Sequence, residues 1–443
     1  MNRVLNKCFR NMHLTWKLKR KLTVSIGIIY RCLYCFEYSS TAISALYYYK
    51  KSFNVENPKF YYGCSMAAIF LSAIISNYIC GRAMDKTRDL RKIVLTLSLF
   101  NIIGNLTYTL TWSPWLPVLG RFVCGIATGI GAAVTGEFNR IYKEKKELAQ
   151  MLSLKAFIST TCMALAPCTP LFFYGIHFQI GSWRISQDNF IGIFLASITS
   201  CMWIFSYFGL HNLTKDPESP FSDFNKNNSN ARISNEDKLW TTKEIVKDRY
   251  LMLLLVAEGY LAFQYFQMEL EINLMAVEYF HWPMLQLGLI TSIAIIASTG
   301  TLYLTQKKLM GSALNILFLY VVGLVIIGVL ESIILFGTVT KFDKPLQHVV
   351  IFTTLFFNIV QGFGSTVYCQ WLMFSITPSH SSSIIESHRY IIARALACLA
   401  FFTASYVYDI LKYIIPVYSL ITYILILLLL SNRFHYVERK SIK

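Results

Sequence analysis

The chain has 443 residues, of which 55% are hydrophobic and 15% are charged, and its formal net charge is +17. This composition excludes an ordinary soluble globular protein, and the length leaves little beyond a set of apolar spans of about 20 residues each. The positive charge does not indicate nucleic-acid binding, because the basic residues lie in short segments flanking apolar runs, where they orient the chain and contact anionic lipid.

Twelve apolar runs predict an all-α membrane protein with twelve transmembrane helices. In chain order they are 22–48, 60–80, 93–112, 116–138, 156–176, 189–210, 250–273, 284–306, 312–337, 347–372, 390–408 and 413–430. Outside these runs, 31 Lys and Arg residues lie in alternate segments beginning with the N-terminal tail, and seven lie in the others. Because positively charged loops are retained in the cytoplasm, this alternation predicts that both termini are cytoplasmic.

A long polar segment divides the predicted spans into two groups of six. It is rich in Asn, Ser, Asp and Lys, and such a composition does not form a buried core. The predicted organisation is a cytoplasmic tail at 1–21, a six-helix bundle at 22–210, a cytoplasmic linker at 211–249, a second six-helix bundle at 250–430 and a cytoplasmic tail at 431–443. This arrangement is typical of transporters built from two related bundles, and two unrelated bundles are the alternative.

The segment between the second and third spans carries a motif. It reads Gly81-Arg-Ala-Met-Asp85-Lys86 and continues with further basic residues. It resembles the signature loop of the major facilitator superfamily, which latches the cytoplasmic side in one state of the transport cycle. The resemblance implies that Gly81 lets two helices approach closely, that Asp85 accepts hydrogen bonds from a helix N-terminus and that Lys86 bridges to a facing acid. The family's second glycine is replaced by Arg88.

The fourth span resembles the same superfamily. Gly125 and Gly129, four residues apart, predict a flat strip on which another helix packs, and Arg121 precedes them by one turn. The Gly-Pro hinge that the family carries in its fifth span is only partly present, as Pro167 and Pro170.

A narrower resemblance covers about a quarter of the chain. Residues 119–203 and 382–406 resemble the lysosomal ceroid-lipofuscinosis-type branch of the superfamily. It implies a lysosomal or endosomal membrane, with the plasma membrane as the alternative.

Ionisable side chains inside spans are costly to bury unless they are paired or hydrated, so they are the first candidates for a site. The resemblance implies that spans one, four, seven and ten line a central cavity, and most of the buried charges lie on these spans. Arg121 has an alternative role as a structural partner of a neighbouring helix. The predicted substrate and coupling residues are Arg31, Glu37, Arg121, Glu258, Tyr265, Gln361 and Arg394.

The sequence therefore predicts a secondary or facilitative transporter that moves a small solute by alternating access. An anionic or zwitterionic solute is favoured, because Arg31 and Arg121 have no acid four residues away on their own helices. Protons are a candidate coupling ion, through Glu258 or Glu37. A channel-like anion pathway and a non-transporting membrane scaffold are the alternatives. Without a catalytic, metal-binding or phosphate-binding motif, we expect no enzyme, metal or cofactor, and as partners only the solute and membrane lipid, with a monomer favoured.

Overall fold

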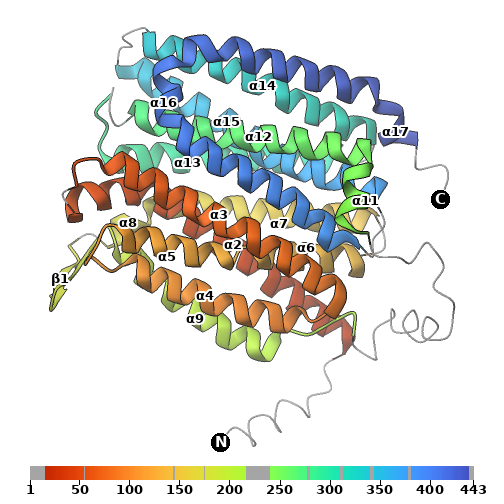
Figure 1. Cartoon of the computed structure of the whole chain (residues 1–443), viewed down its shortest axis with the longest axis horizontal. Coiled ribbons are helices and arrows are strands. Elements are labelled where there is room, and N and C mark those ends of the chain that lie inside the picture. Colours follow the sequence, from red (N-terminus) through yellow and green to blue (C-terminus); the bar gives the residue numbers. More distant parts are fainter. Residues whose placement is uncertain are drawn as a thin grey trace, which may run out of the picture.

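The computed structural model describes residues 15–53, 55–142, 145–173, 175–215, 240–276, 280–309, 313–339, 344–377 and 381–438. Part of each predicted tail and most of the predicted linker lie outside this set. The described residues form long helices that lie side by side (Figure 1). Before the linker these are α2 (Trp16–Tyr48), α3 (Pro58–Thr87), α4 (Leu90–Tyr108), α5 (Trp115–Ile126), α6 (Gly129–Ile141), α7 (Lys145–Leu165), α8 (Thr169–Phe172) and α9 (Phe190–Gly209).

The second half of the chain continues the same architecture. We call the two parts the N-terminal half (α2–α9) and the C-terminal half (α12–α16). The helices after the linker are α11 (Thr242–Lys247), α12 (Arg249–Leu274), α13 (Met284–Leu309), α14 (Ala313–Val339), α15 (Lys344–Ile376), α16 (Ser382–Ser431) and α17 (Arg433–Glu438).

Local sequence signals set both ends of α3 and the start of α4. The Asn57 side chain accepts a hydrogen bond from the backbone of Phe60 at 3.2 Å and caps the start of α3. The helix ends where Arg88 adopts a left-handed conformation with φ of 53°. Asp89 then caps α4 by accepting from the backbone of Lys92 at 3.1 Å. The two helices are therefore joined by a tight turn next to the predicted signature loop.

Several boundaries differ from the sequence-based prediction. The span predicted at 116–138 is divided into α5 and α6 by a turn at residues 127–128. Helix α7 begins at Lys145, well before the predicted residue 156, and passes into a 3-10 turn (Ala166–Cys168) that contains one of the predicted prolines. The chain is also not wholly α-helical, because β1 (His177–Ile180) and β2 (Trp183–Ser186) form an antiparallel hairpin. Gly181, with φ of 60°, supplies its turn.

Helix α16 replaces two predicted spans, 390–408 and 413–430. It is continuous over 50 residues and contains Pro416. A straight helix of this length would extend about 75 Å, more than twice the thickness of a bilayer core. Figure 1 shows instead that its ribbon crosses the molecule, turns and returns along the upper edge. The absence of a loop between the two passes was not foreseen from the sequence.

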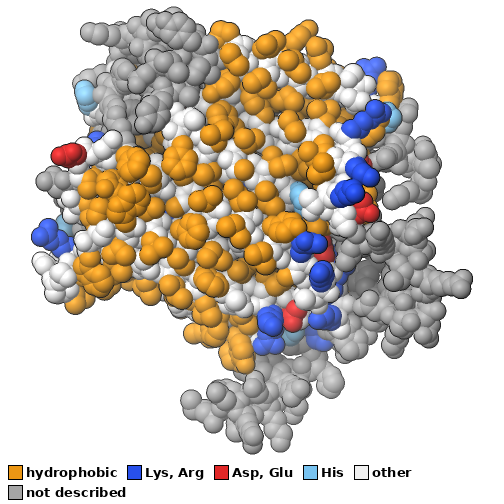
Figure 2. Space-filling model, in the orientation of Figure 1, with side chains coloured by type: hydrophobic (Ala, Val, Ile, Leu, Met, Phe, Trp, Pro, Cys, Tyr) orange, Lys and Arg blue, Asp and Glu red, His pale blue; other side chains and the backbone are white. Residues whose placement is uncertain are grey.

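The two ends of the helical bundle differ. The latch end is the end where α3 finishes and α6 meets the start of α16, defined by Asp85, Arg140 and Ile384. The hairpin end is the opposite end, defined by β1 and β2. Figure 2 shows hydrophobic side chains over the middle of the visible face, with Lys and Arg side chains along the latch end. Ile75 and Ile79 of α3 are each 58% exposed, as expected for a surface that faces lipid.

Six helices in the described part of the chain are long and apolar enough to cross a membrane. Their apolar segments are Phe60–Thr87, Trp115–Ile141, Phe190–Gly209, Arg249–Asn273, Gln286–Leu304 and Pro345–Ile376. Helix α3 packs against α5, α6 and α16, so it belongs both to the interior of the N-terminal half and to the contact between the halves. A Cβ atom at Gly125 would overlap Ile69 and Ser72 of α3, and one at Gly129 would overlap Ser76. These glycines let α5 and α6 lie directly against α3.

Candidate functional site

Two adjacent cavities lie between the helices in the described part of the chain. The central cavity, of about 110 Å³, is lined by α2, α7, α12, α15 and α16, and so lies between the two halves. The side cavity, of about 50 Å³, is lined mainly by helices of the N-terminal half. The cavities share four lining residues, Arg31, Tyr34, Tyr390 and Arg394.

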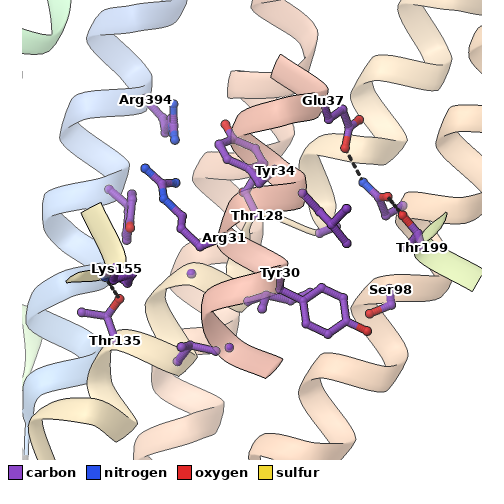
Figure 3. Close-up of a pocket in the computed structure, with 18 residues that line it drawn as sticks. Tyr30, Arg31, Tyr34, Glu37, Ser98, Thr128, Thr135, Lys155, Thr199 and Arg394 are labelled. Atoms are coloured by element: carbon purple, nitrogen blue, oxygen red, sulfur yellow. Dashed lines mark hydrogen bonds between the residues drawn. The ribbon is translucent and has the colours of Figure 1, made fainter. Parts of the chain in front are cut away.

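Arg31 and Arg394 approach this junction from opposite halves. The Tyr34 ring centroid lies 5.4 Å from the Arg31 guanidinium carbon and 5.3 Å from that of Arg394. Arg394 also lies 4.8 Å from the Phe70 ring centroid, so aromatic faces partly stabilise both cations. Among the described residues, neither arginine forms an ion pair. Figure 3 shows the two guanidinium groups and the Tyr34 hydroxyl pointing toward one region.

The junction contains buried donors that no described residue accepts from. Within the described residues, the Arg394 Nε and the Tyr34 hydroxyl are both buried and have no hydrogen-bond partner. Such groups are uncommon in folded proteins, because each loses its water without gaining a replacement. Convergent unpaired donors beside two cations can bind an anion.

Lys155 of α7 adds a third cation to the side cavity. Its side chain is buried, and its Nζ donates to the Thr135 hydroxyl of α6 at 2.9 Å (Figure 3). The sequence analysis counted it as a loop residue, because the fifth span was drawn from residue 156.

Glu258 lines the central cavity from α12 and is part of a buried charge cluster. Its Oε1 accepts from Arg389 Nη1 at 2.5 Å and from the Thr366 hydroxyl at 3.2 Å, while its Oε2 has no partner among the described residues. Arg389 also donates to Glu386 at 2.8 and 2.9 Å, and Gln370 donates to Glu386 at 2.6 Å. One arginine is therefore shared by two carboxylates.

Sequence reasoning missed Arg389 and Glu386. The eleventh span was predicted to begin at residue 390, whereas α16 begins at Ser382, two turns earlier. The sequence did contain one signal for this pair. Glu386 and Arg389 are three residues apart, a spacing that places an acid and a base on one helix face.

Glu37 and Arg121 pair with each other. Arg121 Nη1 lies 2.7 Å from Glu37 Oε1, and Arg121 is 1% exposed. Asn101 and Asn105 donate to the Glu37 carboxylate at 2.8 and 3.3 Å. Glu37 lines the side cavity, but Arg121 lines neither cavity of the described structure and instead stacks 4.5 Å from the Tyr108 ring centroid. This position agrees with the alternative role of Arg121, that of a structural partner of a neighbouring helix.

Tyr265 and Gln361 lie in different environments. Tyr265 lines the central cavity together with Glu258, and its ring fills the space where a Cβ on Gly362 would be. Gln361 is buried but lines neither cavity of the described structure; its side chain faces Gly323 of α14.

The latch end joins the two halves through polar contacts. Asp85 accepts from Arg140 Nη2 and, at 2.9 Å, from the backbone N–H of Ile384 at the start of α16. Arg140 also donates to Ser383 at 2.6 Å. A Cβ on Gly81 would overlap Ser387 of α16. Lys86 is exposed and forms no ion pair with another described residue.

The hairpin end joins the halves mainly through aromatic rings. The Tyr38 hydroxyl donates to Glu269 Oε2 at 2.9 Å, across the contact between α2 and α12. The Phe266 ring centroid lies 5.0 Å from that of Phe70 and 5.7 Å from that of Phe401. These rings lie on the hairpin side of the central cavity, so the two halves are in contact on both sides of it.

Comparisons with known proteins agree with the helical fold described above. A profile described as Major Facilitator Superfamily matches residues 27–387. The MFS-type transporter PUL3 of Kluyveromyces lactis is 24% identical over 149 residues, 33% of this chain and 32% of that protein. The chain thus matches about a third of the length of this curated relative.

Two solved structures have the same fold over nearly their whole length. The human organic anion transporter MFSD10 (TETRAN) has a TM-score of 0.63 and 12% identity, with 92% of this chain and 99% of that chain covered. A bacterial homologue of the iron transporter ferroportin in an outward-facing state has a TM-score of 0.59 and 14% identity, with 92% and 99% covered.

Proposed function

Because the chain belongs to the major facilitator superfamily, whose members are membrane transporters, we propose that it moves a small organic anion across the membrane by alternating access. The family resemblance seen in the sequence is confirmed by the profile match, and the chain is a multi-pass integral membrane protein. The lysosomal branch and a lysosomal or endosomal location remain predictions.

The observation that carries the proposal is the pair Arg31 and Arg394. They belong to opposite halves, line both cavities and have no acidic partner among the described residues. A carboxylate placed between them would accept charge-assisted hydrogen bonds from both guanidinium groups and from the Tyr34 hydroxyl. It would also connect the two halves, so that binding the solute favours a conformation in which both arginines reach it.

Contacts between the halves at both ends favour alternating access by movement of the halves, and they argue against a continuous channel. The Asp85 contacts join the halves at the latch end, and the Phe70, Phe266 and Phe401 rings join them on the hairpin side. Opening one end while the other stays closed gives alternating access. We propose that the chain crosses the membrane twelve times, with two passes in α16, and that the latch end and both termini are cytoplasmic, as the distribution of basic residues indicates.

Glu258 is the proposed coupling residue. It lines the central cavity, one of its oxygens is unpaired among the described residues, and it shares Arg389 with Glu386. A solute anion that attracts Arg389 would loosen its contact with Glu258 and allow the carboxylate to take up a proton. Glu37 is less suited to this role, because both of its oxygens accept hydrogen bonds.

Uptake into reconstituted vesicles tests this function. The purified chain should take up labelled organic anions, such as benzoate and succinate, with saturable kinetics. Arg394→Ala should abolish uptake, whereas Lys92→Gln, which removes an exposed cation from α4, should not affect it. A current that does not saturate would favour the channel-like alternative, and the absence of flux for every anion tested would favour the scaffold.

A further inference from the structure

We propose that the transported solute is a dicarboxylate, with one carboxylate between Arg31 and Arg394 and the second at Lys155. This inference rests on the proposed function and specifies its substrate class. It starts from the charges on the cavity walls, which the arginine pair alone does not account for.

Lys155 has unused binding capacity. Its side chain is 6% exposed, and it lines the side cavity that Arg31 and Arg394 also line. An ammonium group has three N–H donors, and among the described residues only the Thr135 hydroxyl accepts from it. Burying such a group without an acid is costly, because it loses water and gains no opposite charge. A second anionic group in the side cavity would remove that cost.

The acids near Lys155 already have other partners. Glu37 lines the same cavity but accepts from Arg121, Asn101 and Asn105. Glu386, whose charge also acts on Lys155, accepts from Arg389 and Gln370. In the described part of the chain, neither carboxylate forms an ion pair with Lys155.

The sum of charges at the junction indicates two negative charges on the solute. Glu37 and Arg121 neutralise each other. Around the junction this leaves four cations, Arg31, Arg394, Lys155 and Arg389, and two carboxylates, Glu258 and Glu386. If all six groups are ionised, they carry two more positive than negative charges. A dicarboxylate balances this excess, and a monocarboxylate leaves half of it.

The two cavities differ in the solute groups that they suit. In addition to Lys155, the side cavity is lined by the polar side chains of Ser98, Asn101 and Thr199. The central cavity presents the rings of Tyr265 and Phe266, and also the carboxylate of Glu258, which would repel a second anionic group. Its Arg389 is already shared by two carboxylates. The second carboxylate therefore enters the side cavity, and the carbon chain that joins the two anionic groups lies across the junction.

A binding experiment with matched acids tests the inference. Binding of the dicarboxylates from malonate to adipate is measured on the purified full-length chain by thermal shift and by competition for uptake. Each is compared with the monocarboxylate of equal carbon number, for example succinate with butyrate. The best dicarboxylate should bind about tenfold more tightly than its monocarboxylate, the effect of one added charge-assisted contact.

Substitutions test whether Lys155 causes this preference for dicarboxylates. Lys155→Met should lower dicarboxylate affinity about tenfold and change monocarboxylate affinity by less than about twofold, and Lys155→Arg should retain the preference. Thr135→Val removes the hydrogen-bond partner of Lys155 without changing charge, so it should also retain the preference. Lys247→Met, at an exposed position of α11, is the matched control.

The outcomes separate this inference from the function on which it rests. Equal affinity for the dicarboxylate and the monocarboxylate in the unaltered chain would overturn the dicarboxylate assignment. A dicarboxylate preference that survives Lys155→Met would overturn the placement of the second carboxylate at Lys155. Both results would leave anion transport intact. The absence of binding and uptake for every acid would overturn the proposed function itself.

Discussion

Four arginines inside the helical bundle are stabilised in two different ways. Arg121 and Arg389 have carboxylate partners, whereas Arg31 and Arg394 have aromatic rings and no described acid. An aromatic ring stabilises a cation by about 0.5–2 kcal/mol, less than the cost of taking the charge out of water. The two ring-stabilised arginines are therefore poised to gain from an added anion, and the two paired arginines are not.

Replacing Arg31 with lysine tests whether the guanidinium shape matters. Arg31→Lys keeps the charge but loses the planar fork that binds a carboxylate through two hydrogen bonds. We expect the transport efficiency for an organic anion to fall about tenfold, with the loss mainly in apparent affinity. Uptake kinetics in vesicles measure this, with Lys92→Gln as the control. Unchanged kinetics in Arg31→Lys would contradict a bidentate contact at this position.

The Glu37–Arg121 pair should act mainly on stability. Arg121→Gln leaves the Glu37 carboxylate buried with only amide donors, and loss of one partner of a buried pair costs about 3–5 kcal/mol. We expect a clearly lowered midpoint of thermal unfolding in detergent. Glu37→Gln combined with Arg121→Gln should be less destabilising than the sum of the single changes, because no unpaired charge remains. Strictly additive effects would show that the two side chains do not interact.

The residues that the sequence identified were those well inside apolar runs. Arg31, Glu258, Tyr265 and Arg394 were all predicted, and all line the central cavity. Lys155 was missed because a charged residue ends an apolar run when sequence alone is considered. In the fold, α7 extends ten residues before Lys155, so the boundary of apolar composition lies inside the helix. Burial of such a residue depends on neighbours from other helices, which the local sequence does not reveal.

At the scale of the elements, close contact between α3 and α16 controls the latch end. Gly81 has no room for a side chain, because a Cβ there would meet Ser387 and the backbone of Ser383. Gly81→Ala should separate the two helices and open the central cavity toward the latch end. Cys35, which is buried and lines this cavity, is a native reporter. We expect its alkylation by N-ethylmaleimide, followed by mass spectrometry, to become several-fold faster.

Gly300 supplies the matched control for this change. It also lies in a long helix, α13, but a Cβ there would have no neighbour within 4 Å. Gly300→Ala should leave Cys35 alkylation unchanged and slightly stabilise the protein, since alanine favours helix by about 1 kcal/mol over glycine. Adding Ser387→Gly to Gly81→Ala should partly restore slow alkylation, because it removes the overlap with the Ser387 side chain and leaves only the contact with the Ser383 backbone. If Gly81→Ala alone alkylates at the original rate, Gly81 does not control closure.

Element boundaries were predictable where local chemistry sets them. The signature loop was recognised at residues 81–92, and Asp89 caps α4 within it. The two passes of α16 and the hairpin of β1 and β2 were not foreseen. A break between two apolar runs is expected to be a loop, yet α16 is assigned as one helix through its turn. The hairpin depends on contacts outside its own sequence, since the Trp183 side chain donates to the Thr109 backbone at 2.8 Å.

At the scale of the whole molecule, the contacts between halves lie in three layers. Polar contacts of Asp85 lie at the latch end, the arginine junction lies in the middle, and the Phe70–Phe266–Phe401 rings lie at the hairpin end. The polar layer depends on a few directional contacts, whereas the aromatic layer depends on packing. An anion bound in the middle layer would contact residues of both halves. It would therefore favour conformations in which the polar layer and the aromatic layer are closed.

The orientation of these layers in the membrane can be tested with two single cysteines. Lys247→Cys places a thiol on exposed α11 near the latch end, and Gln179→Cys places one on the exposed hairpin. If basic segments are retained in the cytoplasm, a membrane-impermeant maleimide applied to the cytoplasmic face of sealed vesicles should label Lys247→Cys and not Gln179→Cys. Applied to the other face, it should label only Gln179→Cys. The reverse pattern would place the latch on the non-cytoplasmic side, and the proposed direction of gating would then have to be inverted.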